Sequence, residues 1–268
     1  MPLRNARGRL RRRDVMLTTD HILDLYRRYA SDLKAVRRRQ YWFHRWHENA
    51  VVRRLRKLRL RRHMLFPALD DLEAEITYLL IRERRPRVIV EMSPNAGWST
   101  TWILSALRDN GDGGHLWSYD LHPTSTKFVP RDLAKGRWHF VEGDAHRTIP
   151  KAPDFDYLFV DSDHSREFAR WYTAALFPRV KPGTIVSVHD VFHRAEPSEE
   201  GEVVMEWLAR NGMTHWTPSP LVSNGAAQRI FEERKRLGID YVIQHRDGHN
   251  PMLFFEMGQA TRAAGGVR

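Results

Sequence analysis

Short apolar runs and longer amphipathic stretches alternate along this chain after residue 68. The runs are rich in β-branched and aromatic residues and too short for helices, so they predict strands buried on both faces. They cover residues 88–90, 115–119, 138–141, 155–160, 184–188, 214–217 and 252–256. Apolar positions at helical spacing predict helices over residues 69–83, 99–107, 166–177, 202–210 and 226–237. This alternation is typical of an α/β fold with a doubly wound, mostly parallel sheet.

An acidic residue ends, or closely follows, five of the predicted strands. These residues are Glu91, Asp120, Asp144, Asp161 and Asp190. Any one of them could simply cap the helix that follows, which is a common use of a carboxylate at that position. Because ligands of open α/β sheets bind outside the carboxyl ends of the strands, five such acids together predict a shared site there.

The stretch from Arg87 to Leu107 reads as strand, tight loop and helix. Its loop, residues 93–97, consists of turn formers, and Ser99 or Thr100 can cap the helix. Such a unit sets a helix N-terminus beside the end of a strand, where ligands bind. No Gly-Lys-Ser/Thr follows, which argues against a nucleoside triphosphate loop. The alternative interpretation is an ordinary connection between a strand and a helix.

The N-terminal quarter is strongly basic. Residues 1–66 hold 20 Lys and Arg against 5 Asp and Glu, a net +15, whereas the rest holds 24 against 28, a net −4. After an Arg-rich tail, apolar residues at helical spacing predict one helix over residues 19–36 and a second one with Trp42, Trp46, Val51, Leu55 and Leu58 on one side. This arm could lie on an anionic membrane, follow a nucleic-acid backbone, face a second subunit, or pack on the main domain as a solvated helix.

Composition narrows the class of protein. The chain has no cysteine, which excludes disulfides and thiolate metal sites, and no apolar run approaches the roughly 20 residues of a membrane span. The Arg-rich start lacks the apolar segment of a secretory signal, so we expect a cytoplasmic protein, peripheral to the membrane if the arm binds lipid. Pro67 suggests a boundary between an Arg-rich helical N-terminal extension, residues 1–66, and the α/β domain, residues 67–268.

The segment Glu91–Thr100 resembles the first motif of class I S-adenosylmethionine-dependent methyltransferases, in the form found in small-molecule O-methyltransferases: acid, x, Gly, three residues, Gly, aromatic, Ser, Thr. Ser93 stands where the first glycine is usual. The resemblance covers roughly residues 69–256 and implies a Rossmann-like, seven-stranded sheet. It also implies a set of residues that bind the cofactor, with Asp120 on the ribose hydroxyls and the segment around Asp144 by the adenine. The set is Glu91, Ser93, Asn95, Gly97, Ser99, Asp120, Asp144 and Ala145.

The second half of the domain is similar to the metal-dependent branch that methylates macrolide sugars and cephalosporin-type antibiotics. The similarity lies in Phe159–Ser165, Lys181-Pro182-Gly183 and Val188-His189-Asp190. It implies that Asp161, His189 and Asp190 bind a divalent metal, Mg²⁺ or Mn²⁺, and that His164 is the catalytic base. Imidazole at position 189 suits softer ions better than Mg²⁺. The alternative is that Asp161 or Asp163 caps the next helix and His164 is a surface residue.

The predicted function is O-methylation of a small-molecule or sugar hydroxyl, as in natural-product or glycan biosynthesis. A divalent ion would lower the pKa of the hydroxyl, and a neutral histidine would remove its proton. The first alternative is an RNA methyltransferase that uses the basic arm, which is less favoured because no Asn-Pro-Pro-aromatic motif follows the fourth strand. The second is a non-catalytic cofactor-binding module. The N-terminal helices also suggest a homo-oligomer.

Overall fold

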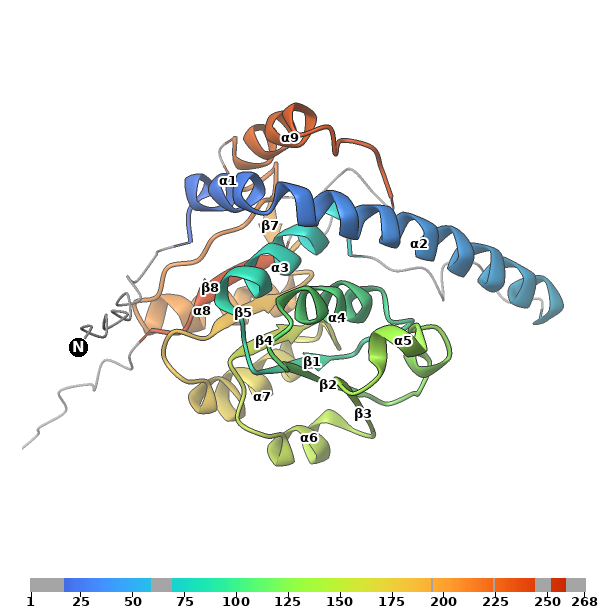
Figure 1. Ribbon diagram of the computed structural model, residues 1–268. Helices are drawn as coiled ribbons and strands as arrows, with labels where there is room; N and C mark the ends of the chain where they lie inside the picture. Colours follow the sequence, from blue (N-terminus) through green and yellow to red (C-terminus); the bar gives the residue numbers. More distant parts are fainter. Residues whose placement is uncertain (1–16, 59–68, 194, 224, 244–251, 259–268) are drawn as a thin grey trace, which may run out of the picture.

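The computed structural model describes residues 17–58, 69–193, 195–223, 225–243 and 252–258, and gives the backbone alone for residues 46–58. One six-stranded sheet forms its centre (Figure 1). Its strands are β1 Val88–Met92, β2 His115–Asp120, β3 Trp138–Glu142, β4 Tyr157–Val160, β5 Ile185–Val188 and β8 Leu253–Glu256. Their order is β3-β2-β1-β4-β5-β8, and every neighbouring pair is parallel except β5 with β8. The chain winds outward from β1 in both directions, which confirms the predicted doubly wound α/β fold.

The prediction of a seventh strand in the sheet was wrong. Residues 214–217 contribute a single antiparallel bridge, between Trp216 and Phe254, rather than a strand. Pro218 and Pro220 follow directly. Proline has no backbone N–H to donate, so a ladder beside β8 cannot continue there. Two short strands, β6 Phe192–His193 and β7 Glu196–Pro197, pair with each other in a separate sheet.

Helices cover both faces of the sheet. The helices after residue 70 are α3 Asp71–Arg84, α4 Trp98–Asn110, α5 Arg131–Ala134, α6 Ala145–Thr148, α7 Arg166–Ala175, α8 Glu199–Arg210 and α9 Ala226–Arg236. Figure 1 shows α3 and α4 on one side and α6 and α7 on the other. Alternate strand residues enter two separate cores: Ile89 and Phe159 pack toward α3 and α4, and Val90 and Leu158 toward α7 and α8. Burial on both faces explains the continuous apolar runs.

The N-terminal segment forms α1 Thr19–Arg28 and α2 Ala30–Leu58. The predicted helix over residues 19–36 is therefore interrupted at Tyr29, where φ is −104° and ψ is 21°. Leu25, Leu33 and Val36 lie in the same core as α3, whereas the far end of α2 extends beyond the body (Figure 1).

The side chains of Trp46, Val51, Leu55 and Leu58 lie outside the described residues, as do Pro67 and the Arg-rich tail up to residue 16. The division of the chain at residue 67 stays a prediction. None of the described helices combines the length and apolar content that a bilayer-spanning helix requires.

Candidate active site

Two cavities lie at the carboxyl ends of the parallel strands. The first, about 340 Å³, lies beside the β1–α4 loop and reaches the residues that follow β4 and β5. The second, about 360 Å³, lies between the ends of β2 and β3 and the start of α7. Both are lined by Ser93, Asp120 and Ser162, so they meet at the end of β1. We refer to the two cavities together as the cleft.

The β1–α4 loop is held in an unusual backbone conformation. Ser93, Asn95 and Gly97 all have positive φ, at 58°, 46° and 89°. The Ser93 N–H donates to the Tyr119 carbonyl (2.7 Å), and the Asn95 N–H donates to the Asp120 carboxylate (3.0 Å). A Cβ at Gly97 would approach Val129 Cγ2 to 2.5 Å, so glycine is required for close packing of the loop. Ser93, Asn95 and Ser99 line the first cavity, whereas Gly97, also predicted to bind the cofactor, is not among the residues that line the cleft.

Ser93 is strained because an L-residue with a side chain disfavours the left-handed region. We expect Ser93→Gly to raise the free energy of unfolding by about 0.5–1 kcal/mol, after the greater freedom of glycine in the unfolded chain is subtracted. Ser162 lines the same cleft but does not have positive φ. Ser162→Gly is therefore the matched control and should lower stability. Urea denaturation measures both, and a Ser93→Gly protein less stable than wild type would contradict strain at this position.

Glu91 is fully buried beneath the start of α4. Its carboxylate accepts hydrogen bonds from the hydroxyls of Ser99 (2.7 Å), Thr100 (2.9 Å) and Ser118. Burial raises the pKa of Glu91 to about 7, although these hydroxyls oppose the rise. We predicted that Glu91 contacts the cofactor, but it is not among the described residues that line the cleft. Its carboxylate instead binds the hydroxyl of Ser99, and Ser99 lines the cleft.

Glu91 should make stability depend on pH. Its pKa is raised from 4.5 to about 7 in the folded protein, because burial favours the protonated carboxyl group. The folded protein therefore has its full stability below pH 4.5 and loses part of it as the pH rises toward 7, where the buried group must ionise. The loss is on the order of 3 kcal/mol. Glu91→Gln cannot ionise, so its stability relative to wild type should increase by that amount between pH 4.5 and pH 8. Urea denaturation across this range tests the expectation, and a constant difference between the two proteins would contradict it.

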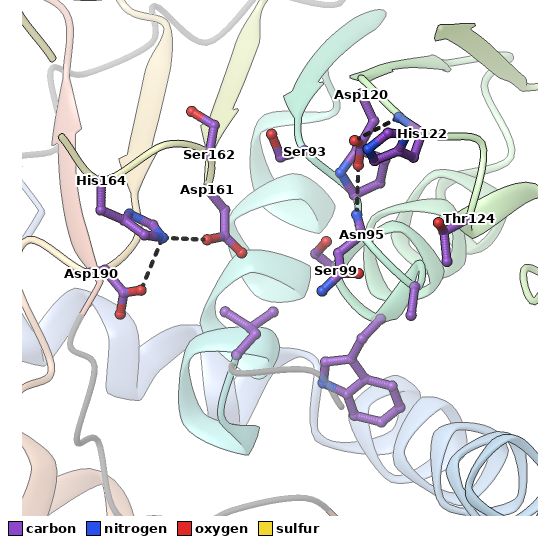
Figure 2. A pocket seen from close by; sticks show the side chains of 14 residues that line it. Ser93, Asn95, Ser99, Asp120, His122, Thr124, Asp161, Ser162, His164 and Asp190 are labelled. Carbon is purple, nitrogen blue, oxygen red and sulfur yellow. Dashed lines mark hydrogen bonds and ion pairs between the residues drawn. The ribbon is translucent and has the colours of Figure 1, made fainter. Parts of the chain in front are cut away.

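Asp120 faces the point where the two cavities meet. One carboxylate oxygen accepts the Asn95 N–H (3.0 Å) and the other accepts the His122 N–H (3.1 Å), as Figure 2 shows. In the second cavity, Asp144 caps α6 and also contacts the ring of His146 (2.9 Å), next to Ala145. The residues predicted for the ribose and the adenine are thus neighbours in one cleft.

A group of two carboxylates and an imidazole lies at the other end of the first cavity. His164 Nε2 is 3.1 Å from Asp190 Oδ2 and 3.8 Å from Asp161 Oδ1 (Figure 2). One donor atom from each of these three residues lies within 4.8 Å of the others, a spacing compatible with a single metal ion. Asp190 has positive φ (54°), which is strained and is found at functional sites. Burial alone would lower the pKa of His164, but the neighbouring carboxylates of Glu200 and Asp190 raise it.

His189, predicted as a metal ligand, is completely buried behind the two aspartates. Its Nε2 contacts Glu73 of α3 (3.2 Å), and its Nδ1 lies 3.3 Å from both Asp161 Oδ1 and Asp190 Oδ1. His189 Nδ1 and Asp190 Oδ1 face each other at this distance, and a ring N–H paired with a carboxylate oxygen satisfies both atoms.

Sequence reasoning missed several residues that shape the cleft. His122 and Ser162 line it, Glu73 contacts His189, and Glu200 Oε2 of α8 lies 2.8 Å from His164 Nδ1. His122 and Ser162 lie three and two residues past the ends of predicted strands, so their positions in the sequence could have identified them. Glu73 and Glu200 lie in the first turns of helices, among other acids, where an acid is ordinary.

Residues 90–191 match a family described as a methyltransferase domain. A curated relative from Mycolicibacterium smegmatis, named "Putative O-methyltransferase", is 28% identical over 92 residues, which make up 32% of this chain and 42% of that protein. One from Mycobacterium sp. (strain KMS), with the same name, is 27% identical over 92 residues, 32% of this chain and 40% of that protein. The chain thus spans about two fifths of the curated relatives that it matches.

Solved structures share the fold. The S-adenosylhomocysteine-bound methyltransferase PaMTH1 of Podospora anserina aligns with a TM-score of 0.54 and 14% identity, over 81% of this chain and 88% of that one. The O-methyltransferase TomG of Streptomyces achromogenes, solved with S-adenosylmethionine, aligns with a TM-score of 0.51 and 18% identity, over 79% and 90%. Residues 90–191 thus resemble a methyltransferase domain, and the chain shares its fold with these two solved methyltransferases.

Proposed function

We propose that this protein transfers a methyl group from S-adenosylmethionine to a hydroxyl of a small molecule or sugar. The observation that carries the proposal is the convergence, in one cleft, of Asp120 with the Asp161, His164 and Asp190 group. Asp120 suits the ribose of the methyl donor, and the group of Asp161, His164 and Asp190 suits the oxygen of the acceptor. Transfer is an in-line displacement at the methyl carbon, so donor and acceptor must be aligned in a shared, water-poor space.

The donor half of the cleft would be built from the ends of β1, β2 and β3. Asp120 can accept two charge-assisted hydrogen bonds from the ribose hydroxyls, because its carboxylate is fixed by backbone N–H groups on both oxygens. Asp144, Ala145 and His146 would surround the adenine. Ser93, Asn95 and Ser99 would line the methionine portion, next to the N-terminus of α4.

The acceptor half would be built from the ends of β4 and β5. Asp161 and Asp190 would hold a divalent cation, with His189 Nδ1, 3.3 Å from a carboxylate oxygen of each, as the nitrogen donor in place of its proton, so that His164 Nε2 stays free to act as a base. When bound, the cation lowers the pKa of the acceptor hydroxyl. His164 would take the hydroxyl proton as the new carbon–oxygen bond forms. Mixed oxygen and nitrogen donors favour Mn²⁺ over Mg²⁺.

This acidic, histidine-bearing site favours a hydroxyl acceptor over an RNA base. For the basic arm we propose a role separate from catalysis, as a surface for a second subunit or an anionic membrane, since α2 extends beyond the body that holds the cleft (Figure 1). A cytoplasmic location is part of the same proposal.

Asp120→Ala tests the donor half. Loss of two charge-assisted hydrogen bonds should weaken S-adenosylmethionine binding about 10–100-fold, as measured by titration calorimetry. Asp132→Ala is the matched control, because Asp132 is exposed on α5 and lies outside the cleft, and its affinity should stay within about twofold of wild type. Equal affinities for the Asp120→Ala and wild-type proteins would refute the assignment of Asp120.

A further inference from the structure

Glu200 is a buried carboxylate with no role in the function proposed above. It lies in the first turn of α8 with 1% of its surface exposed. Its Oε2 lies 2.8 Å from His164 Nδ1, and its Oε1 accepts from the hydroxyl of Tyr172 on α7 (2.7 Å). Both oxygens are therefore engaged by side chains from other elements.

Hydrogen bonds and close packing hold the start of α8 against the residues that follow β5. Ser198 caps the helix, and its hydroxyl donates to the Asp190 carbonyl (2.7 Å) while its N–H donates to the Val191 carbonyl (2.8 Å). A Cβ at Gly201 would lie 1.9 Å from the Val191 carbonyl oxygen, so glycine alone permits this close approach. The position of Glu200 is thus fixed relative to Asp190.

This geometry decides which nitrogen of His164 faces the cleft. Carboxylates face both ring nitrogens, Glu200 at Nδ1 (2.8 Å) and Asp190 at Nε2 (3.1 Å). The contact with the more deeply buried Glu200 is the shorter one, so we expect a neutral ring to carry its proton on Nδ1. Nε2 then presents its lone pair toward Asp190 (3.1 Å) and Asp161 (3.8 Å). Either a base that takes a proton or a ligand that binds a cation requires this tautomer, and a carboxylate behind the imidazole is a common way to select it.

We infer that Glu200 is a positioning residue, which acts through His164 by holding the ring with Nε2 toward the two aspartates. Tyr172 supports it by engaging the other oxygen of the carboxylate. The inference rests on the proposed function for its consequence in catalysis, but the tautomer of His164 is a property of the protein alone.

Nitrogen NMR of protein labelled with ¹⁵N-histidine tests the inference without a turnover assay. The signals of the His164 ring nitrogens are identified as those missing from the spectrum of His164→Gln. Spectra are recorded after metal removal, at a pH high enough that the ring is neutral and its chemical shifts no longer change with pH. The wild-type ring is expected with the proton on Nδ1. A wild-type ring with the proton mainly on Nε2 would overturn the inference, whether or not the protein is a methyltransferase.

Glu200→Leu should remove the preference for protonated Nδ1 and lower kcat about 10–100-fold, with the KM for S-adenosylmethionine within about twofold. Glu202→Gln is the matched control, because Glu202 lies on the same helix, is exposed and pairs with Arg166. This control should leave both the tautomer of the His164 ring and kcat unchanged. A Glu200→Leu protein with wild-type tautomer and kcat would show that Glu200 only packs the core; if this variant does not fold, the wild-type spectrum still decides.

Discussion

His164→Ala is expected to lower kcat about 10²–10⁴-fold, the usual contribution of a general base. A sugar or alcohol hydroxyl is a poor nucleophile at neutral pH, so removal of its proton must accompany the transfer. The His164 imidazole lines the cleft beside Asp161 and Asp190 and is the group there that is suited to this task. The KM for S-adenosylmethionine should stay within about twofold, because the donor half of the cleft is built from β1, β2 and β3.

The rate is measured as S-adenosylhomocysteine released over a panel of sugars and diols that support wild-type turnover. His139→Ala is the matched control, since His139 lies on the edge strand β3, stacks on Trp117 and is not among the residues that line the cleft. It should keep kcat within about twofold. A His164→Ala enzyme with kcat close to wild type would remove His164 from the mechanism.

The double variant Asp161→Asn, Asp190→Asn is expected to weaken Mn²⁺ binding about 100-fold or more, because an amide oxygen carries no charge to offset that of the ion. Calorimetric titration of the apo protein measures the binding. Turnover should fall with it, and chelator treatment of the wild-type enzyme should reproduce the loss until Mn²⁺ is added back.

Asp163→Asn provides the control for this loop. Asp163 follows the same strand, but its carboxylate accepts from the Ser165 N–H and it is outside the group of three donors. Its Mn²⁺ affinity should match wild type. Full turnover of chelated wild-type enzyme would exclude a metal-dependent mechanism, while leaving the assignment of Asp120 intact.

The sequence predicted the fold because strands buried on both faces leave an unambiguous signal. Ile89 and Val90 enter opposite cores, so no polar residue interrupts the run. Residues 214–217 carried a weaker form of the same signal, but Pro218 and Pro220 limit them to one bridge. The break at Tyr29 had no signal, since neither proline nor glycine marks it.

The candidate site was predictable where a side chain follows a strand, because parallel strands end at one edge of the sheet. Asp120, Asp161 and Asp190 were found in this way. Glu73 and Glu200 were not, because they reach the edge from helices, and only tertiary packing decides which turn of a helix meets a strand end. Glu91 lies inside β1, one residue before its end, and its carboxylate bonds the start of α4 rather than lining the cleft.

The most direct test is a crystal structure of the protein grown with S-adenosylhomocysteine and Mn²⁺. The account predicts the ribose on Asp120, the adenine beside Asp144 and Ala145, and an anomalous manganese signal between Asp161 and Asp190. A nucleoside bound elsewhere, or a cleft that stays empty at saturating ligand, would contradict it.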